Sequence, residues 1–91
     1  MNSIIQDKKE CYICHTNKNL QIHHIFFGKN RHVSEQPGFK VWLCLNHHTG
    51  DEGIHFDKDV DLTLKRLCQK EYEKTHTRED FIRLINRNYL N

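Results

Sequence analysis

The spacing of hydrophobic positions predicts two strands in the first half of the chain. Residues 20–27 are rich in aromatic and β-branched side chains, and residues 39–43 alternate between apolar and polar positions. Both patterns are typical of strands. Residues 29–37 between them are polar and partly basic, which predicts a loop that ends at Pro37-Gly38. The second range therefore returns beside the first, and we expect a β-hairpin.

Helical spacing dominates the rest of the chain. A short helix should begin at Cys44, and residues 49–53 contain two glycines that end it within two turns. Apolar residues then recur at helical spacing from about residue 60 to residue 74. Thr77, followed by two acidic residues, predicts the N-cap of a last helix. Residues 1–10 are polar, and we expect a loose lead-in or a short helix there. The fold class is α+β.

Length and composition suggest a single domain that needs extra stabilisation. Ninety-one residues, of which 36% are hydrophobic, bury only a modest apolar surface. Domains of this size often depend on a bound metal or a disulfide. The net charge of +2 and the pI near 8.4 permit DNA binding without arguing for it. We expect no signal peptide and no membrane segment, and therefore a cytoplasmic location.

Cysteine and histidine spacing predicts a structural zinc site. Cys11 and Cys14 lie two residues apart, so that one turn can aim both sulfurs at one point, and Cys44 and His47 share a face of the predicted short helix. A Cys₃His set is typical of tetrahedral zinc. Two disulfides are the alternative, but paired spacing without a secretion signal favours zinc. His48 in place of His47 is a second alternative.

The remaining histidines predict a second, reactive site. His48 lies about 100° around the helix from His47, and His23 and His24 point to opposite faces of a strand. A bend at the end of that strand would let His23, His48 and His55 hold one divalent ion, with His24 unligated beside it. Such an ion neutralises a scissile phosphate, and a neutral imidazole takes a proton from water. Chance clustering, or a single zinc that uses every histidine, is the alternative.

The order of these motifs resembles the HNH endonucleases, also called the ββα-metal or His-Me finger family. The resemblance rests on Cys-x-x-Cys, His-His-Ile, Leu-Cys-x-x-His-His and Gly-x-His between residues 11 and 56, and it is closest to small phage-encoded members of the recombination-enhancement type. It implies a ββα-metal core at about 11–56 with a zinc knuckle, and a helical C-terminal extension at about 58–90. Residues 1–91 would form one nuclease domain.

The resemblance also assigns roles to individual residues. It implies that His24 is the general base, that His23, His48 and His55 bind the catalytic ion, and that the four zinc ligands named above support the fold. The ion would be Mg²⁺, Mn²⁺, Ni²⁺ or Zn²⁺, and the products would carry a 5′-phosphate and a 3′-hydroxyl. Lys29 and Arg31 lie in the predicted loop, where they can contact DNA phosphates.

One departure from the family pattern concerns the orientation of the base. The family's central Asn normally lies in the second strand, but residues 39–43 contain none, and Asn30 and Asn46 are candidates by composition only. We therefore expect a backbone carbonyl to orient His24. Cys68 lies on the apolar face of a predicted helix, which indicates a small buried side chain and not a fifth ligand. Four aromatic residues are expected in the core rather than in a base-stacking surface: Phe26, Phe27, Phe39 and Trp42.

The function that we predict is a metal-dependent DNA endonuclease of phage or prophage origin, acting in the cytoplasm of a bacterial host, with phage or recombination proteins as potential partners. The main alternative is a non-catalytic zinc-stabilised module that binds DNA or protein. A second alternative is an accessory or inhibitory phage factor that contacts another protein through its C-terminal helices.

Overall fold

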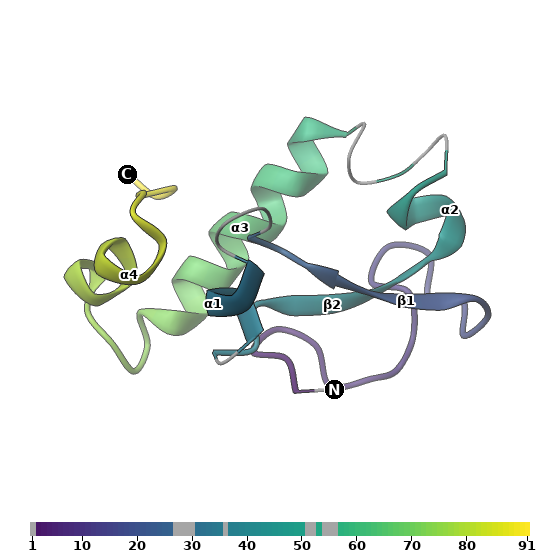
Figure 1. Cartoon of the computed structure of the whole chain (residues 1–91), viewed down its shortest axis with the longest axis horizontal. Coiled ribbons are helices and arrows are strands. Elements are labelled where there is room, and N and C mark those ends of the chain that lie inside the picture. The colour runs from purple at the N-terminus through teal and green to yellow at the C-terminus, as the bar shows by residue number, and fades with distance from the viewer. Residues whose placement is uncertain (1, 27–30, 36, 51–52, 54–56) are drawn as a thin grey trace.

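The computed structural model describes residues 2–26, 31–35, 37–50, 53 and 57–91, and it has mixed α+β architecture. A two-stranded sheet is combined with four helices in this part of the chain (Figure 1). The elements in chain order are β1 (Leu20–His24), α1 (Arg31–Glu35), β2 (Lys40–Cys44), α2 (Leu45–His48), α3 (Lys58–Tyr72) and α4 (Arg78–Ile85).

The two strands pair antiparallel, as the hydrophobic pattern predicted. Ile22 lies opposite Trp42, and His24 lies opposite Lys40. The strand predicted over residues 20–27 ends earlier, at His24, because the chain bends at Ile25 and Phe26. Residue 27 lies outside the described part. The hairpin thus brings the end of β1 beside the start of β2.

The interpretation of residues 29–37 as loop alone was wrong, because α1 occupies residues 31–35. Hydrogen bonds to distant residues hold this single turn. The Ser34 hydroxyl donates to the carbonyl of Phe26 at 2.7 Å and accepts from its N–H at 3.2 Å. The N–H of Phe39 donates to the carbonyl of Ser34 at 2.8 Å. These contacts fix α1 against the hairpin, and polar composition alone does not predict them.

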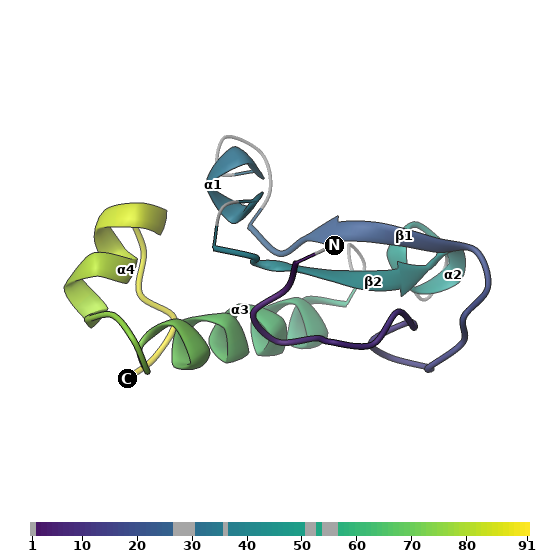
Figure 2. The same ribbon diagram turned by 90° about the horizontal axis from the view of Figure 1, so that it is seen from below.

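Helix α3 packs along one side of the sheet, while α1 lies on the other side (Figure 2). The core between the sheet and α3 contains Val41, Leu43, Leu64 and Cys68, all at most 2% exposed. The aromatic rings of Phe26, Phe39 and Phe81 extend it toward α4, with ring centroids 5.3–6.0 Å apart. This burial is the main stabilising contribution that the apolar side chains can make.

The predicted cap of the last helix is confirmed, and the predicted aromatic core is confirmed in part. Thr77 caps α4 in a capping box with Asp80, in which each side chain accepts from the other residue's backbone N–H. Phe26 and Phe39 are buried as expected, whereas Trp42 is half-buried, with the Lys9 ammonium 5.0 Å from its ring centroid. Phe27 lies outside the described residues.

The N-terminal segment is irregular, and the short helix considered for it is not formed in residues 2–10. It lies beside β2, where the Gln6 side-chain oxygen accepts from the N–H of Trp42 at 2.8 Å and the N–H of Tyr12 donates to the carbonyl of Trp42 at 2.9 Å. Ile4 donates to the carbonyl of Gly38 at 2.9 Å. The segment therefore satisfies backbone groups that the two-stranded sheet would leave open.

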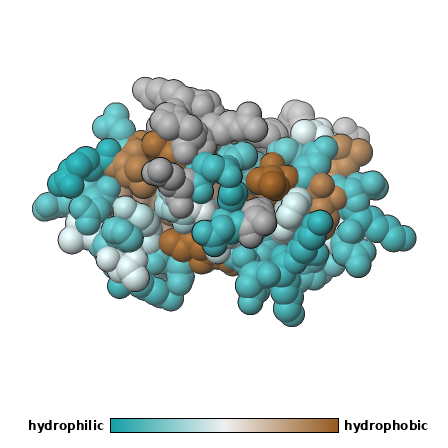
Figure 3. All heavy atoms as spheres, turned by 60° about the horizontal axis from the view of Figure 1, so that its bottom comes forward, coloured by the Kyte–Doolittle hydropathy of each residue, from teal (hydrophilic) through white to brown (hydrophobic). Residues whose placement is uncertain are grey.

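The surface is mainly polar. On the face drawn in Figure 3, apolar residues appear as separate patches among hydrophilic ones. Among the described residues, the exposed large apolar side chains come from four different elements: Ile22, Leu45, Leu67 and Ile82. Within the described residues, no helix has the length and apolar character that crossing a membrane requires.

Candidate metal centre

The four predicted zinc ligands converge on one point. Cys11 and Cys14 lie in a tight turn, in which the N–H of His15 donates to the carbonyl of Cys11 at 2.9 Å. Cys44 ends β2, and His47 follows in α2. The antiparallel pairing of β1 and β2 brings these two pairs together, and their potential ligand atoms all lie within 4.8 Å of one another.

Individual distances match a tetrahedral zinc site. A zinc ion with Zn–S bonds of about 2.3 Å and a Zn–N bond of about 2.0–2.1 Å sets its sulfur ligands about 3.8 Å apart, and sulfur and nitrogen about 3.5 Å apart. The sulfurs of Cys14 and Cys44 are 3.8 Å apart. His47 Nδ1 lies 3.2 Å from the Cys44 sulfur and 3.7 Å from that of Cys11. The donor set and its spacing therefore fit zinc.

Backbone amides favour a thiolate at Cys11. Burial opposes ionisation, but the N–H groups of Cys14, Cys44 and Ile13 outweigh it and lower the pKa of this thiol to about 6. At Cys14 the N–H of Thr16 favours the thiolate, yet desolvation and the neighbouring cysteine sulfurs raise the pKa above its ordinary value. Thiols this close repel one another once ionised. A divalent cation relieves that repulsion because it binds the deprotonated forms.

Cys68 takes no part in this cluster, as the sequence predicted. Its side chain is fully buried within the core, and burial raises the pKa of its thiol. It belongs to α3 and packs with Val41, Leu43 and Leu64. Cys68 is therefore a small apolar side chain, and it gives a cysteine control for the cluster.

The two adjacent histidines of α2 separate, as their helical spacing predicted. His47 faces the cysteines, whereas the ring of His48 meets the ring of His23 edge to face, with centroids 5.3 Å apart. His23 is 2% exposed. His48 Nδ1 lies 2.7 Å from the Gln21 side-chain oxygen. Residues of β1 and α2 thus meet beside the cysteine cluster.

His24 does not join this pair, and a carboxylate orients it. Its Nε2 lies 2.5 Å from Glu35 Oε2, and the Lys40 ammonium contacts the other oxygen of the same carboxylate. The Lys40 contact, followed by the His24 contact, holds the pKa of Glu35 below its usual value. The expected backbone carbonyl is therefore replaced by an acidic side chain. Sequence reasoning missed Glu35 because it lies in a segment interpreted as loop.

Several predicted site residues cannot be placed against this geometry. His55, Lys29 and Asn30 lie outside the described residues. Arg31 begins α1, but only its backbone is described. Asn46 belongs to α2 rather than to β2.

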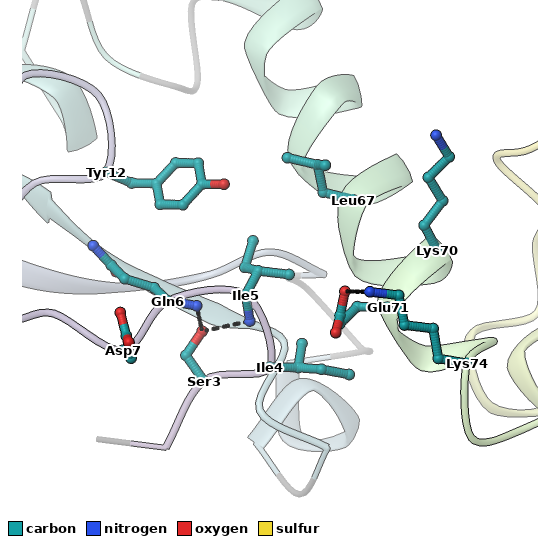
Figure 4. Close-up of a pocket in the computed structure, with 10 residues that line it drawn as sticks. All are labelled: Ser3, Ile4, Ile5, Gln6, Asp7, Tyr12, Leu67, Lys70, Glu71 and Lys74. Atoms are coloured by element: carbon teal, nitrogen blue, oxygen red, sulfur yellow. Dashed lines mark hydrogen bonds and ion pairs between the residues drawn. The ribbon is translucent and has the colours of Figure 1, made fainter.

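A separate groove of about 640 Å³ lies between the N-terminal segment and α3 (Figure 4). Tyr12 and Leu67 form part of its apolar lining, and Lys70 and Glu71 line its α3 side. No histidine is among the described residues that line it. The groove is therefore distinct from the cluster of histidines and cysteines.

Comparisons with protein-family models, with curated proteins and with solved structures found no match to this chain.

Proposed function

We propose that this chain is a metal-dependent DNA endonuclease of the HNH type, built on a ββα-metal core with a structural zinc. One observation carries the proposal: His47 and His48, neighbours in α2, serve two different clusters. His47 completes the Cys₃His group, and His48 meets His23 from β1. A structural zinc does not by itself require the second pair. The order hairpin, short helix and further helices agrees with the proposed core.

The centroid spacing of the His23–His48 pair is compatible with a shared ion. With a metal–nitrogen bond of about 2.0–2.1 Å and a further ~1.2 Å to the ring centre, two imidazoles at a tetrahedral angle have centroids about 5.2 Å apart. The observed separation is 5.3 Å. Imidazole ligands suit Zn²⁺, Ni²⁺ or Mn²⁺, and Mg²⁺ prefers oxygen. His55 would be the third ligand in the proposal.

The proposed chemistry is hydrolysis of a phosphodiester bond. When bound, the divalent ion would neutralise charge on the scissile phosphate and stabilise the leaving oxygen. His24 would take a proton from the attacking water, a role that suits imidazole because it changes charge near neutral pH. Lys29 and Arg31 would contact DNA phosphates. The family resemblance adds a phage or prophage origin and action in the cytoplasm of a bacterial host.

A non-catalytic zinc module is the second candidate. It is favoured by the fact that the described residues complete one metal-ligand group, the Cys₃His cluster, but supply only two histidines for a second ion. Metal counting separates the candidates. One tightly held zinc per chain supports the module, and a second, exchangeable ion supports the nuclease.

The decisive experiment is nicking of supercoiled plasmid DNA with a panel of divalent ions. His24→Ala should lower the rate about 100-fold or more, because a positioned general base contributes about 10²–10⁴. It should keep its zinc and its fold. His76→Ala is the matched control, since His76 is exposed, follows α3, and lies outside both the Cys₃His group and the His23–His48 pair. Equal nicking by wild type and His24→Ala would remove His24 from the mechanism. No nicking by wild type with any ion would favour the zinc module.

A further inference from the structure

We propose that Glu35, clamped by Lys40, is a positioning residue that sets the orientation and the tautomer of His24. The inference rests on the proposed function for its catalytic consequence. It concerns a residue outside the motifs that carry the family resemblance. The inference is based on the contacts among His24 of β1, Glu35 of α1 and Lys40 of β2.

The hairpin register places two of these side chains together. His24 and Lys40 are directly opposite in the antiparallel pair, so they project from the same face of the sheet. Glu35 is the last residue of α1, and its carboxylate contacts both side chains of this pair. Oε2 contacts His24 Nε2, and Oε1 contacts the Lys40 ammonium. Each oxygen of the carboxylate therefore has its own partner.

The burial of Lys40 shows that the contact is more than a surface ion pair. The Lys40 side chain is only 8% exposed, and that of His24 is 15% exposed, while Glu35 is 54% exposed. A buried ammonium is costly unless a counter-charge lies beside it. Within the described residues, Glu35 is the acidic group that contacts Lys40. The lysine in turn fixes the carboxylate, so that Oε2 stays aimed at the imidazole.

The contact also determines which nitrogen of the neutral ring carries the proton. Because its pKa is lowered, Glu35 is ionised at neutral pH, and an ionised carboxylate only accepts hydrogen bonds. His24 must then donate through Nε2–H, which leaves the lone pair on Nδ1. Nδ1 is thus the atom that would take a proton from water. Glu35 supplies the orienting function for which β2 contains no Asn.

Ser34 explains how a residue in such a short helix can hold another side chain in place. Its hydroxyl bonds both backbone groups of Phe26, just after β1, and its carbonyl accepts from Phe39, just before β2. Glu35 follows directly. The carboxylate is therefore anchored to both strands of the hairpin that carry its partners.

Glu35→Gln tests the proposal, because glutamine preserves the size of the side chain but can turn its NH₂ group toward His24 Nε2. The ring would then protonate Nδ1 instead. Glu35→Asp keeps the charge and should partly restore the native tautomer. Glu79→Gln is the control, since Glu79 is an exposed residue of α4. The readouts are the ring ¹⁵N shifts of His24 in the zinc-loaded protein at a pH where the ring is neutral, and kcat and KM for plasmid nicking.

We expect wild type and Glu79→Gln to show the Nε2–H tautomer, and Glu35→Gln to shift toward Nδ1–H. We expect kcat to fall about 10- to 100-fold in Glu35→Gln, the usual effect of losing an orienting partner, with KM for DNA little changed. An unchanged tautomer in Glu35→Gln would overturn the proposal, and so would a changed tautomer with an unchanged kcat. The ring measurement needs no activity. If wild type does not nick DNA but its His24 tautomer still depends on Glu35, the proposed endonuclease function is wrong, and so is the catalytic consequence of Glu35. The control of the His24 tautomer by Glu35 would still hold.

Discussion

The contrast between Cys14 and Cys68 tests whether zinc, and not burial, makes cysteine important to this fold. Cys14 is exposed and belongs to the Cys₃His group, whereas Cys68 is fully buried and lies outside it. If burial alone mattered, Cys68→Ala would be the more damaging substitution. If zinc stabilises the domain, Cys14→Ser must lower the stability more than Cys68→Ala does, although the Cys14 side chain is exposed.

The magnitudes separate these alternatives. Structural zinc contributes about 10–16 kcal/mol of apparent binding free energy, so an equal share for each of its four ligands is about 2.5–4 kcal/mol. Removing the buried sulfur of Cys68 should cost about 1–2 kcal/mol, the usual range for a small loss of core volume. A domain of 91 residues has a free energy of unfolding of about 5–14 kcal/mol. Complete removal of zinc should therefore unfold it, and Cys14→Ser should remove a large share of its stability.

The assay is urea unfolding followed by far-ultraviolet circular dichroism, with zinc per chain measured on the same samples. We expect about one tightly bound zinc per chain in wild type and in Cys68→Ala. Cys14→Ser should lose zinc and shift its unfolding midpoint further than Cys68→Ala does. A strong chelator should unfold wild type. The reasoning would be refuted if chelated wild type kept its native spectrum, or if Cys14→Ser were more stable than Cys68→Ala.

Two further predictions concern local structure and are measured by thermal or urea unfolding of the zinc-loaded protein. Thr77→Ala removes the side chain that caps α4 and should lower the free energy of unfolding by about 1 kcal/mol. Thr77→Ser keeps the hydroxyl and should retain most of the wild-type stability, which would identify the hydroxyl as the cause. Gly38→Ala should cost more than about 1 kcal/mol, because Gly38 has φ +76° and an added Cβ would lie 2.9 Å from the Asn2 carbonyl oxygen. An unfolding midpoint equal to that of wild type would contradict either expectation.

Features that depend on short spacing were predictable from the sequence. The zinc ligands occur as two local pairs, and each pair has a geometry that a turn or a helix dictates. The separation of His47 from His48 follows from the 100° rotation per residue of a helix, and that of His23 from His24 follows from the alternation of a strand. The cap at Thr77 follows from the hydrogen-bonding capacity of a single side chain. In each case, the nearest neighbours in sequence determine the outcome.

The orientation of His24 was not predictable, because it depends on contacts between distant segments. Residues 31–35 lack a helical pattern of apolar residues, and α1 exists because Ser34 is bonded to both ends of the hairpin. Without α1, nothing in the sequence connects Glu35 to a histidine eleven residues earlier. The burial of Lys40 and its contact with Glu35 were not predictable either, because a lysine at the start of a strand is ordinarily solvent-exposed.

The short helix α2 connects the structural cluster to the proposed reactive site. It has four residues, none of them buried, and Cys44 caps it without a side-chain hydrogen bond. A single turn of this kind is not stable by itself. Cys44 at its start and His47 in its third position lie close to Cys11 and Cys14, and a bound zinc would link the four side chains. Zinc would therefore fix the orientation of α2, and with it the position of His48 against His23. The structural zinc and the proposed catalytic ion would each take one ligand from α2, His47 and His48, so that loss of zinc should also disturb the proposed reactive site.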